Sequence, residues 1–571
     1  MEEARISAAS TERDYDVIII GSGMGGLTCA SILAQIAGLR VLIIEQHFKP
    51  GGYTHTFKRP GGYHWDVGVH YVGEMQHGRP ARRLMDLVTG GPVTWEQMSD
   101  PFEVFDYPGL RFKVRAGVER YLADLIAVFP EEEAALRLYF AELPTMSRGP
   151  IGELILRDVG SPVLSLLAQW LGRGRASRRA HATTADYLTS AFRDPRLRAL
   201  LASQWGDHGL PPSQSALMTH AMVASHYLDG GFYPVGGAGG IAKAALAIVR
   251  AHGGALRLRC QAEEILIENG RAVGVRVTER TARGPIERVL RAQHIVSNAG
   301  AEITYRKLLA DRPEAAAARR ELDEIAPGPA HVNLFLGFKD DPRKLGFRGE
   351  NLWIFDRLDH DEVFARRDEL LEGRPHFAYV TFPSLKDPSA RRFTGEIVAF
   401  ASHDAFARWQ KQPWMDRGAE YETLKRRIAE SLIAFVDERY PGYRDLIDYV
   451  EVSTPITTEH LAAHPRGVIY GVAARPERRR MECTRVRTPI PNLYQASADS
   501  LVHGILGATI GGAVAAGVVL GGGVKGLVRI LAAIGRGPTP KAKLAVAPGI
   551  KGSAAGKKAV PASAEQTPGL H

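Results

Sequence analysis

The first spacing that indicates a binding site is that of three glycines. They lie between an apolar run and a segment rich in Ala and Leu. They are Gly21, Gly23 and Gly26, and the apolar run 17–20 precedes them. Glycine lets the backbone approach a pyrophosphate closely, and the free amide groups at the start of the following helix can bind it. Glu45 ends a second apolar run, where a carboxylate can bind ribose hydroxyls. The pattern predicts a dinucleotide site on a strand, a tight turn and a helix.

Two more glycine-rich segments favour FAD over NAD. Gly51 and Gly52 follow the second predicted strand, and this turn resembles the second fingerprint of the glutathione-reductase-like FAD proteins. Near the C-terminus, a predicted strand at 493–496 leads to Asp499 and a glycine-rich helix, and in such proteins this acid holds the pyrophosphate–ribitol region. The resemblance implies FAD contacts at Gly21, Gly23, Gly25, Gly26, Glu45, Gln46, Gly51, Gly52, His55, Asp499, Gly507, Ala508 and Thr509.

A middle segment completes the predicted nucleotide domain. It contains a glycine cluster at 236–240, a helix, strands around Asn269-Gly270, and a short strand within 292–300. No apolar strand leads into the glycine cluster and no spaced acid follows it, so we do not expect a second site for NADPH. Electrons must therefore come from an external partner or from the substrate.

The composition indicates a globular protein of two to four domains. The chain has 571 residues, of which 45% are hydrophobic and 24% charged. Its three cysteines (Cys29, Cys260 and Cys483) are far apart, which argues against a disulfide framework, a zinc site or a dithiol motif. The first 14 residues are polar and do not read as a secretory signal. We expect a cytoplasmic location and no metal.

The positive charge is concentrated at the C-terminal end. From Arg536 onward there are six Lys or Arg residues against one Glu, so this end carries +5 of the net +9. The other residues are nearly balanced at +4, which gives no support for binding of nucleic acid. The segment 534–571 is rich in Pro, Gly, Ala and Lys, and we expect it to be a disordered basic tail.

Three other segments leave membrane contact open. Residues 504–524 carry no charge, but their many glycines favour a buried helix packed near the cofactor over a membrane span. Residues 151–180 are apolar and then basic, so they form either a helix lying on a membrane surface or an ordinary helix of a cap domain. The arginine-rich segment 475–487 is either a lipid-phosphate patch or a solvated loop, and we favour the solvated loop for most of it.

The predicted fold class is α/β, with a Rossmann-like FAD-binding domain of the glutathione-reductase and amine-oxidase type and a discontinuous α+β substrate domain. Three pieces form the first domain: 14–80, 230–330 and 485–533. Two inserted blocks form the second, of which 81–229 is expected to be helical and 331–484 to contain strands.

The chain resembles the phytoene desaturase, carotenoid isomerase and retinol saturase family of flavoproteins over about residues 15–523. The retinol saturase branch is the most similar. The motifs that carry the resemblance are "EQHFKPGGYTHTF", "DVGVHYVGEM", "HYLDGGFYPVGG", "SNAG", "TPITTEHL" and, more specifically, "FPSLKDP" (382–388) and "HPRGVIYG" (464–471).

The resemblance implies flavin chemistry on a C=C or C–C bond of an apolar isoprenoid such as a retinoid or carotenoid. Such enzymes saturate, desaturate or isomerise a polyene that lies in an apolar tunnel ending at the flavin. We favour saturation. Two alternatives stay open: a non-enzymatic prenyl- or lipid-binding protein of the same fold, and a flavoenzyme that acts on a polar amine. We expect the protein to bind the apolar polyene and to exchange electrons with an external donor or acceptor. Peripheral contact with a membrane stays open.

Candidates for proton transfer lie close to the predicted flavin segments. His70, His226 and Tyr227 could protonate a carbon atom or fill hydrogen-bonded positions in the core. His55, beside the Gly51-Gly52 turn, could face the flavin. The chain has no Ser/His/Asp order or P-loop, so hydrolase and kinase functions lack support.

Overall fold

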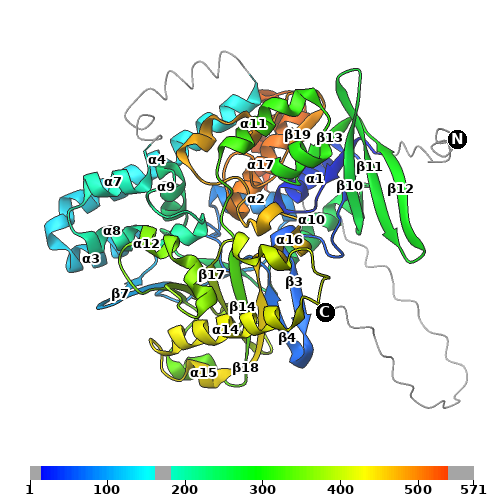
Figure 1. The fold of residues 1–571 in the computed structure, drawn as a ribbon. Helices are drawn as coiled ribbons and strands as arrows, with labels where there is room; N and C mark the ends of the chain where they lie inside the picture. The colour runs from blue at the N-terminus through cyan, green and yellow to red at the C-terminus, as the bar shows by residue number, and fades with distance from the viewer. Residues whose placement is uncertain (1–14, 161–181, 538–571) are drawn as a thin grey trace, which may run out of the picture.

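A five-stranded parallel sheet lies at the centre of the nucleotide-binding region in the computed structural model, which describes residues 15–160 and 182–537 (Figure 1). Its strands come from three distant parts of the chain. In sheet order they are β19 (Leu493–Gln495), β13 (His294–Ser297), β1 (Val17–Ile20), β2 (Val41–Ile44) and β9 (Ala255–Arg257). This sheet confirms the predicted α/β fold class.

Both faces of the parallel sheet are covered, which explains its continuous apolar strands. Every residue of β1 and β2 is buried. Val17 and Ile19 pack on one side against α1 (Met24–Ala37), α10 (Gly239–Ala251) and α17 (Gly504–Val519). Ile18 and Ile20 pack on the other side with α11 (Ala316–Glu324) and the strands that follow β9.

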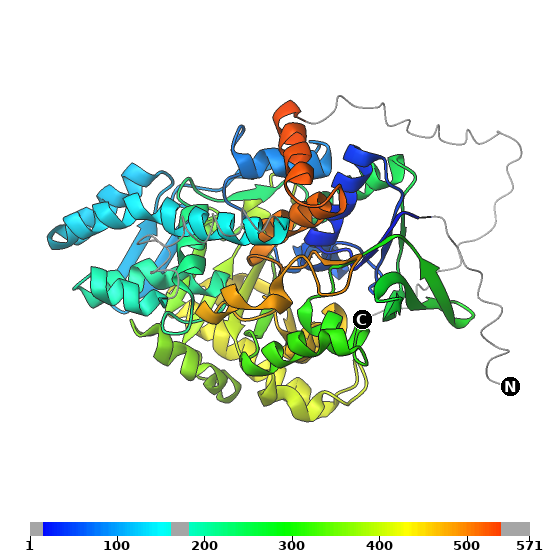
Figure 2. The ribbon, with the colours of Figure 1, turned by 90° about the horizontal axis from the view of Figure 1, so that it is seen from above.

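A three-stranded antiparallel sheet projects from this region (Figure 2). Its strands are β10 (Cys260–Glu268), β11 (Arg271–Thr281) and β12 (Gly284–Arg291). The turn between the first two has positive φ angles at Asn269 (49°) and Gly270 (71°), as the Asn-Gly pair predicts for a tight hairpin.

A seven-stranded sheet forms the second large layer. Its order is β18 (Ile447–Ser453), β14 (His331–Phe338), β17 (Phe393–Phe400), β16 (Phe377–Thr381), β15 (Asn351–Phe355), β6 (Glu103–Tyr107) and β7 (Leu110–Val114). The first inserted block is therefore not wholly helical, because it supplies β6 and β7. All five residues of β6 are buried where it pairs in parallel with β15.

Helices cover both faces of the seven-stranded sheet. One face carries α14 (Gly418–Asp437) and α15 (Tyr443–Leu446). The other face meets a helical cap of α3 (Val118–Val128), α4 (Glu133–Val159), α7 (Thr184–Ala191), α8 (Pro195–Ala202) and α9 (Leu217–His226), visible on the left of Figure 1. Shorter helices are α12 (His360–Ala365), α13 (Pro383–Lys386) and α16 (Pro455–Ala462).

Two small antiparallel sheets of two strands each complete the structure, and only the first of them is a hairpin. One pairs β3 (Thr56–Arg59) with β4 (Tyr63–Asp66), and the other pairs β5 (Trp95–Gln97) with β8 (Phe232–Pro234). The Trp65 indole N–H donates to the carbonyl of Leu336 at 3.2 Å. Strand β4 therefore contacts strand β14 of the seven-stranded sheet.

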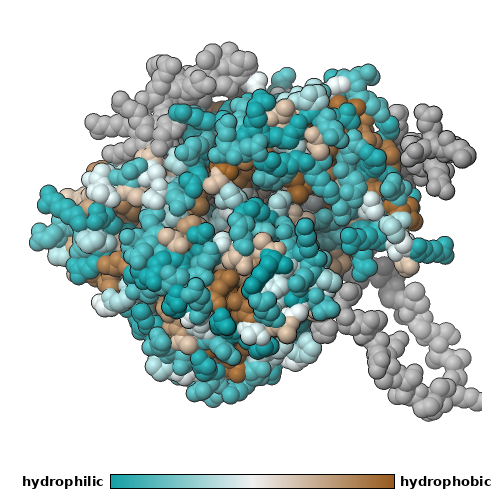
Figure 3. All heavy atoms as spheres, viewed as in Figure 1, coloured by the Kyte–Doolittle hydropathy of each residue, from teal (hydrophilic) through white to brown (hydrophobic). Residues whose placement is uncertain are grey.

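The uncharged segment 504–524 contains helix α17, most of which is buried. The face of the molecule seen in Figure 3 is mainly hydrophilic. Among the described residues, no helix is both long and apolar enough to cross a bilayer. Helix α18 (Val524–Arg536) follows at the outer edge of the molecule, beyond α2 (Pro80–Thr89), and includes the first residues of the predicted tail (Figure 2). The rest of that tail and residues 161–181 lie outside the described residues.

Candidate active site

The glycine turn is held by close backbone packing. Gly21 has a φ of 95°, which favours glycine. A Cβ atom on Gly25 would lie 1.5 Å from the carbonyl oxygen of Ala496, and one on Gly26 would lie 2.4 Å from that of Gly21. Gly23 begins α1, and no side chain caps the free amides of that helix. The turn thus offers uncapped N–H groups on residues that carry no side chain, which fits a pyrophosphate.

Glu45 is fixed against the same turn. Its carboxylate accepts hydrogen bonds from the Ser22 amide at 2.9 Å, the Ser22 hydroxyl at 2.6 Å and the His47 amide at 2.8 Å. The Gly51 amide donates to the Ser22 hydroxyl at 3.2 Å, so the two predicted glycine turns meet at this serine. Both turns and the carboxylate therefore lie at one end of the parallel sheet.

The second glycine turn brings His55 and Gln46 to the site periphery. A Cβ atom on Gly52 would lie 3.1 Å from the Cα of Gly23, so this turn too approaches the start of α1. His55 Nδ1 donates to the Gly52 carbonyl at 2.6 Å, and burial lowers the pKa of His55 to about 4. Gln46 is exposed.

Asp499 is enclosed by two loops that the sequence motifs had singled out. Its two carboxylate oxygens accept from the amides of Ala301 and Val472, each at 2.7 Å. A Cβ atom on Gly471 would lie 2.0 Å from Asp499 Oδ1, and one on Gly300 would lie 3.1 Å from Oδ2. The glycines of "SNAG" and "HPRGVIYG" are thus required by the close approach of this carboxylate.

The three predicted contacts on α17 lie in its first two turns. A Cβ atom on Gly507 would lie 2.3 Å from the carbonyl oxygen of Val502. Ala508 is buried in an apolar cluster, and the Thr509 hydroxyl donates to the carbonyl of Ile505 at 2.7 Å. This end of α17 therefore packs tightly beside α1 and the Asp499 loop.

The solvated-loop interpretation of segment 475–487 is wrong for its central residue. Arg478 is buried and donates to the carbonyls of Val472, Ala498 and Asp499 at 2.8 to 3.1 Å. Burial lowers the pKa of Arg478 to about 10. Arg479 pairs with Glu153, which ties the loop to α4. The arginines anchor the Asp499 loop, a task that composition alone did not indicate.

The predicted proton-transfer histidines are neutral. Burial lowers the pKa of His70 to about 3 and that of His226 to about 4. The His226 Nε2 atom accepts a hydrogen bond from the Gly73 amide at 2.8 Å, which gives this ring a structural role. His70 Nδ1 lies 3.9 Å from Glu396 Oε2 and has no hydrogen-bond partner among the described residues. Their action as proton donors stays a prediction.

Tyr227 belongs to a buried polar cluster that the sequence did not reveal. Its ring stacks on Tyr71 with centroids 4.1 Å apart. The Tyr71 hydroxyl lies 2.6 Å from Glu103 and 2.7 Å from Asp207. Lys386 Nζ lies 5.8 Å from the centre of the Tyr71 ring. Tyr71, Tyr227 and Lys386 lie in the motifs "DVGVHYVGEM", "HYLDGGFYPVGG" and "FPSLKDP", whereas the two acids come from segments without a local signal.

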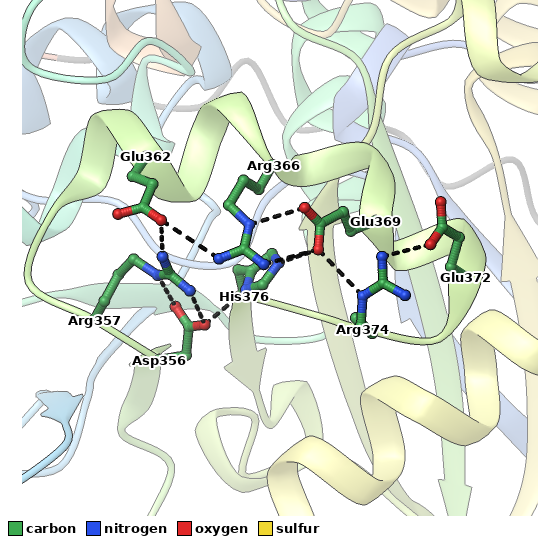
Figure 4. A network of polar contacts seen from close by, with 8 residues as sticks. All are labelled: Asp356, Arg357, Glu362, Arg366, Glu369, Glu372, Arg374 and His376. Carbon is green, nitrogen blue, oxygen red and sulfur yellow. Dashed lines mark hydrogen bonds and ion pairs between the residues drawn. The ribbon is translucent and has the colours of Figure 1, made fainter.

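A second polar network lies at the end of β15 and has a different character (Figure 4). His376 Nδ1 lies 2.6 Å from Asp356, and Arg366 and His376 lower the pKa of Glu369. The network joins Asp356, Arg357, Glu362, Arg366, Glu369, Glu372, Arg374 and His376. Its acidic side chains form ion pairs with arginines near solvent. We therefore infer that this network stabilises the loop between β15 and β16.

Comparisons with known proteins identify the family. The flavin containing amine oxidoreductase family matches residues 24–520. The chain belongs to this family. It is 32% identical to the all-trans-retinol 13,14-reductase of Danio rerio, over 90% of this chain and 87% of the relative, and 31% identical to the enzyme of that name from Homo sapiens over the same shares.

More distant comparisons agree with this family. The chloroplastic prolycopene isomerase of Daucus carota is 26% identical, over 80% of this chain and 72% of the relative. The solved structure of cyclohexylamine oxidase from Brevibacterium oxydans has a TM-score of 0.56 and 18% identity, covering 89% of this chain and 99% of that one, which shows the fold alone. The protein is therefore a flavin-dependent oxidoreductase, and the resemblance noted in the sequence is confirmed.

Proposed function

We propose that this enzyme is an FAD-dependent saturase that reduces a C=C bond of an apolar isoprenoid, either a retinoid or a carotenoid. The similarity to all-trans-retinol 13,14-reductase over 90% of the chain carries this proposal. One relative at 28% identity is named an inactive all-trans-retinol 13,14-reductase, so overall identity does not decide activity. Activity therefore depends on the residues of the site and has to be measured.

The glycine turns and two acids fit FAD. We assign the pyrophosphate to the uncapped start of α1 around Gly23, and the adenosine ribose to Glu45. Asp499 and the start of α17, with the Gly51-Gly52 turn opposite, would hold the ribitol and flavin end. When bound, the flavin supplies hydride transfer at a ring nitrogen. The protein must position the polyene, exclude water and exchange a proton at the second carbon.

Desaturation and isomerisation remain the alternatives within this family, because the prolycopene isomerase relative is also similar. A purely lipid-binding role and amine oxidation have less support. The intact Gly21, Gly23 and Gly26 turn with Glu45 argues for a working cofactor site. The solved cyclohexylamine oxidase is only 18% identical, whereas the retinol reductases are more than 30% identical.

An anaerobic turnover experiment tests the proposal. The FAD-loaded enzyme is reduced and mixed with a conjugated polyene such as all-trans-retinol, and the product mass and flavin absorbance are followed. A gain of two hydrogens with flavin reoxidation is expected. An unchanged mass with a shifted elution would assign isomerisation instead, and turnover only by the oxidised enzyme would assign desaturation.

We also propose that the enzyme takes its apolar substrate from an anionic membrane surface through α18. Val524, Val528 and Leu531 lie one turn apart on this helix and are 41%, 56% and 65% exposed. The helix also carries Lys525, Arg529 and Arg536, and it has no acidic residue. An apolar ridge with basic neighbours suits a bilayer interface with anionic lipids.

Vesicle flotation of the full chain tests this contact. Binding to phosphatidylcholine vesicles containing phosphatidylserine is expected to fall in a Val528→Ser, Leu531→Ser variant. A Met415→Ser variant, altered at another exposed apolar side chain, should bind as the wild type does. Equal binding of all three proteins would reject α18 as the contact, and a change in oligomeric state on mutation would assign the ridge to a second copy of the chain.

A further inference from the structure

The hydroxyl of Tyr71 lies between two buried carboxyl groups. It is 2.6 Å from Glu103 Oε1 and 2.7 Å from Asp207 Oδ2. A phenol has one hydrogen to donate, and an ionised carboxylate can only accept. Two ionised carboxylates would therefore leave one of these contacts without a hydrogen. One of the two acids must retain a proton for both hydrogen bonds to form.

The other partners of Glu103 identify it as the ionised member. Glu103 accepts from the Trp353 indole N–H at 3.1 Å and from the Gln204 amide at 2.8 Å. With Tyr71, three donors converge on its two oxygens. Asp207 has only Tyr71 as a hydrogen-bond partner in the described part of the chain. Asp207 thus carries the proton and donates to Tyr71, which in turn donates to Glu103.

The charges that face Asp207 are consistent with a retained proton. Lys386 is the cation beside it, and its three N–H groups are directed to the His70 carbonyl at 2.9 Å, Asn351 Oδ1 at 2.5 Å and Thr381 Oγ1 at 2.5 Å. The other titratable groups around Asp207 are Glu103, Tyr71, Tyr227, Tyr379 and Tyr470. One cation cannot balance two buried carboxylates. Burial raises the pKa of Asp207 to about 7 and that of Glu103 to about 8, so the pair holds a proton near neutral pH. The three donors that converge on Glu103 place this proton on Asp207.

Asp207 is also the accessible member of the pair. Glu103 is fully buried, whereas Asp207 is partly exposed at the junction of the cap and the seven-stranded sheet. The hydroxyl of Tyr379 is buried nearby and has no hydrogen-bond partner at ordinary distance and angle among the described residues. Asp207 is therefore the member of the pair that can exchange its proton with its surroundings, whereas Glu103 is enclosed in the core.

We propose that Asp207 is the acid that protonates the substrate carbon, and that Tyr71 and Glu103 are positioning residues that keep it protonated. This role rests on the proposed function. In the saturation, one carbon of the C=C bond gains the hydride of the reduced flavin. The other carbon forms a C–H bond with the Asp207 proton as the O–H bond breaks. The resulting carboxylate regains its proton from solvent.

Infrared spectroscopy tests the retained proton without any turnover. At pH 7 the protonated-carboxyl absorption of the wild-type protein should be reduced by the share of one carboxyl group in an Asp207→Asn variant, while other buried acids such as Glu396 continue to absorb. The matched control is Glu132→Gln, because Glu132 is also buried but accepts two backbone amides, from Arg193 and Asp194. The control should keep the full absorption. An undiminished protonated-carboxyl absorption in Asp207→Asn would overturn the assignment.

Single-turnover kinetics test the delivery of the proton. The Asp207→Asn variant should bind FAD normally and lose about 100-fold in the rate of product formation, with partial rescue by Asp207→Glu. The Tyr71→Phe variant should move the pH profile of turnover rather than abolish it. Wild-type rates in Asp207→Asn would overturn the proposal. Failure of the proposed function is distinguishable, since the wild type would then leave the polyene unchanged while the absorption of the Asp207 carboxyl group persists.

Discussion

Gly512 of α17 lies against the backbone of Gly25 in α1, so closely that a Cβ atom on Gly512 would stand 2.2 Å from the Gly25 carbonyl oxygen. The two helices that begin at the predicted pyrophosphate and flavin ends of the cofactor thus meet without intervening side chains. This contact fixes the position of the N-terminal part of the site relative to the C-terminal part.

Adding a methyl group at this contact should destabilise the protein. We expect Gly512→Ala to lower the free energy of unfolding by about 1–3 kcal/mol, because the neighbouring atoms are backbone and cannot rotate away. Urea denaturation measures the effect. Gly535→Ala in α18 is the control, since nothing lies within 4 Å of its Cβ position. A stability equal to that of the wild type would show that the helices can separate freely.

Neutralising Glu45 should weaken FAD binding while leaving the fold intact. In Glu45→Gln the Ser22 contacts retain an acceptor, but the charged hydrogen bond to ribose is lost. We expect the dissociation constant for FAD to rise roughly 10- to 100-fold. Fluorescence titration of the flavin-free protein measures it, with the exposed Glu96→Gln as the control. Equal affinity of both variants would remove Glu45 from the cofactor site.

Stability should fall in acid through the buried histidines. The pKa of His226 is about 4 in the folded protein and about 6.5 in the unfolded chain, so unfolding takes up a proton between these values. Its stabilising contribution is present above pH 6.5 and is lost as the pH falls towards 4. The slope of unfolding free energy against pH should decrease by about 1.4 kcal/mol per pH unit in His226→Gln. An unchanged slope would show that His226 is accessible to protons in the folded state.

Buried and exposed arginines should respond differently to the same substitution. Arg478→Met leaves the carbonyl oxygens of Ala498 and Asp499 without their donor, and we expect a loss of about 3 kcal/mol. Arg366→Met removes ion pairs near solvent and should leave the melting temperature almost unchanged. Thermal denaturation of both variants measures the two effects. Equal decreases in melting temperature would contradict the expected difference between a buried and an exposed arginine.

Local patterns predicted one half of the site and missed the other. The strand Val17–Ile20, the turn after it and the position of Glu45 follow from neighbouring residues, and the structure has them as expected. The cluster around Tyr71 joins partners 32 and 136 residues away, Glu103 and Asp207, from separate elements. Acids in such segments are ordinary surface residues by composition. Only the tertiary packing that removes them from water gives them chemistry.

The order of the parallel sheet has a consequence for synthesis on the ribosome. Strand β19 completes the edge beside β13, and α17 then covers α1, so the cofactor site lacks its last wall until nearly all of the chain has been translated. Gly25 and Gly512 are 487 residues apart in sequence. At roughly 5–20 residues per second, the first glycine turn waits about 25–100 s for its partner. During that time the apolar residues of α1 lack the helix that later packs on them and are exposed to aggregation.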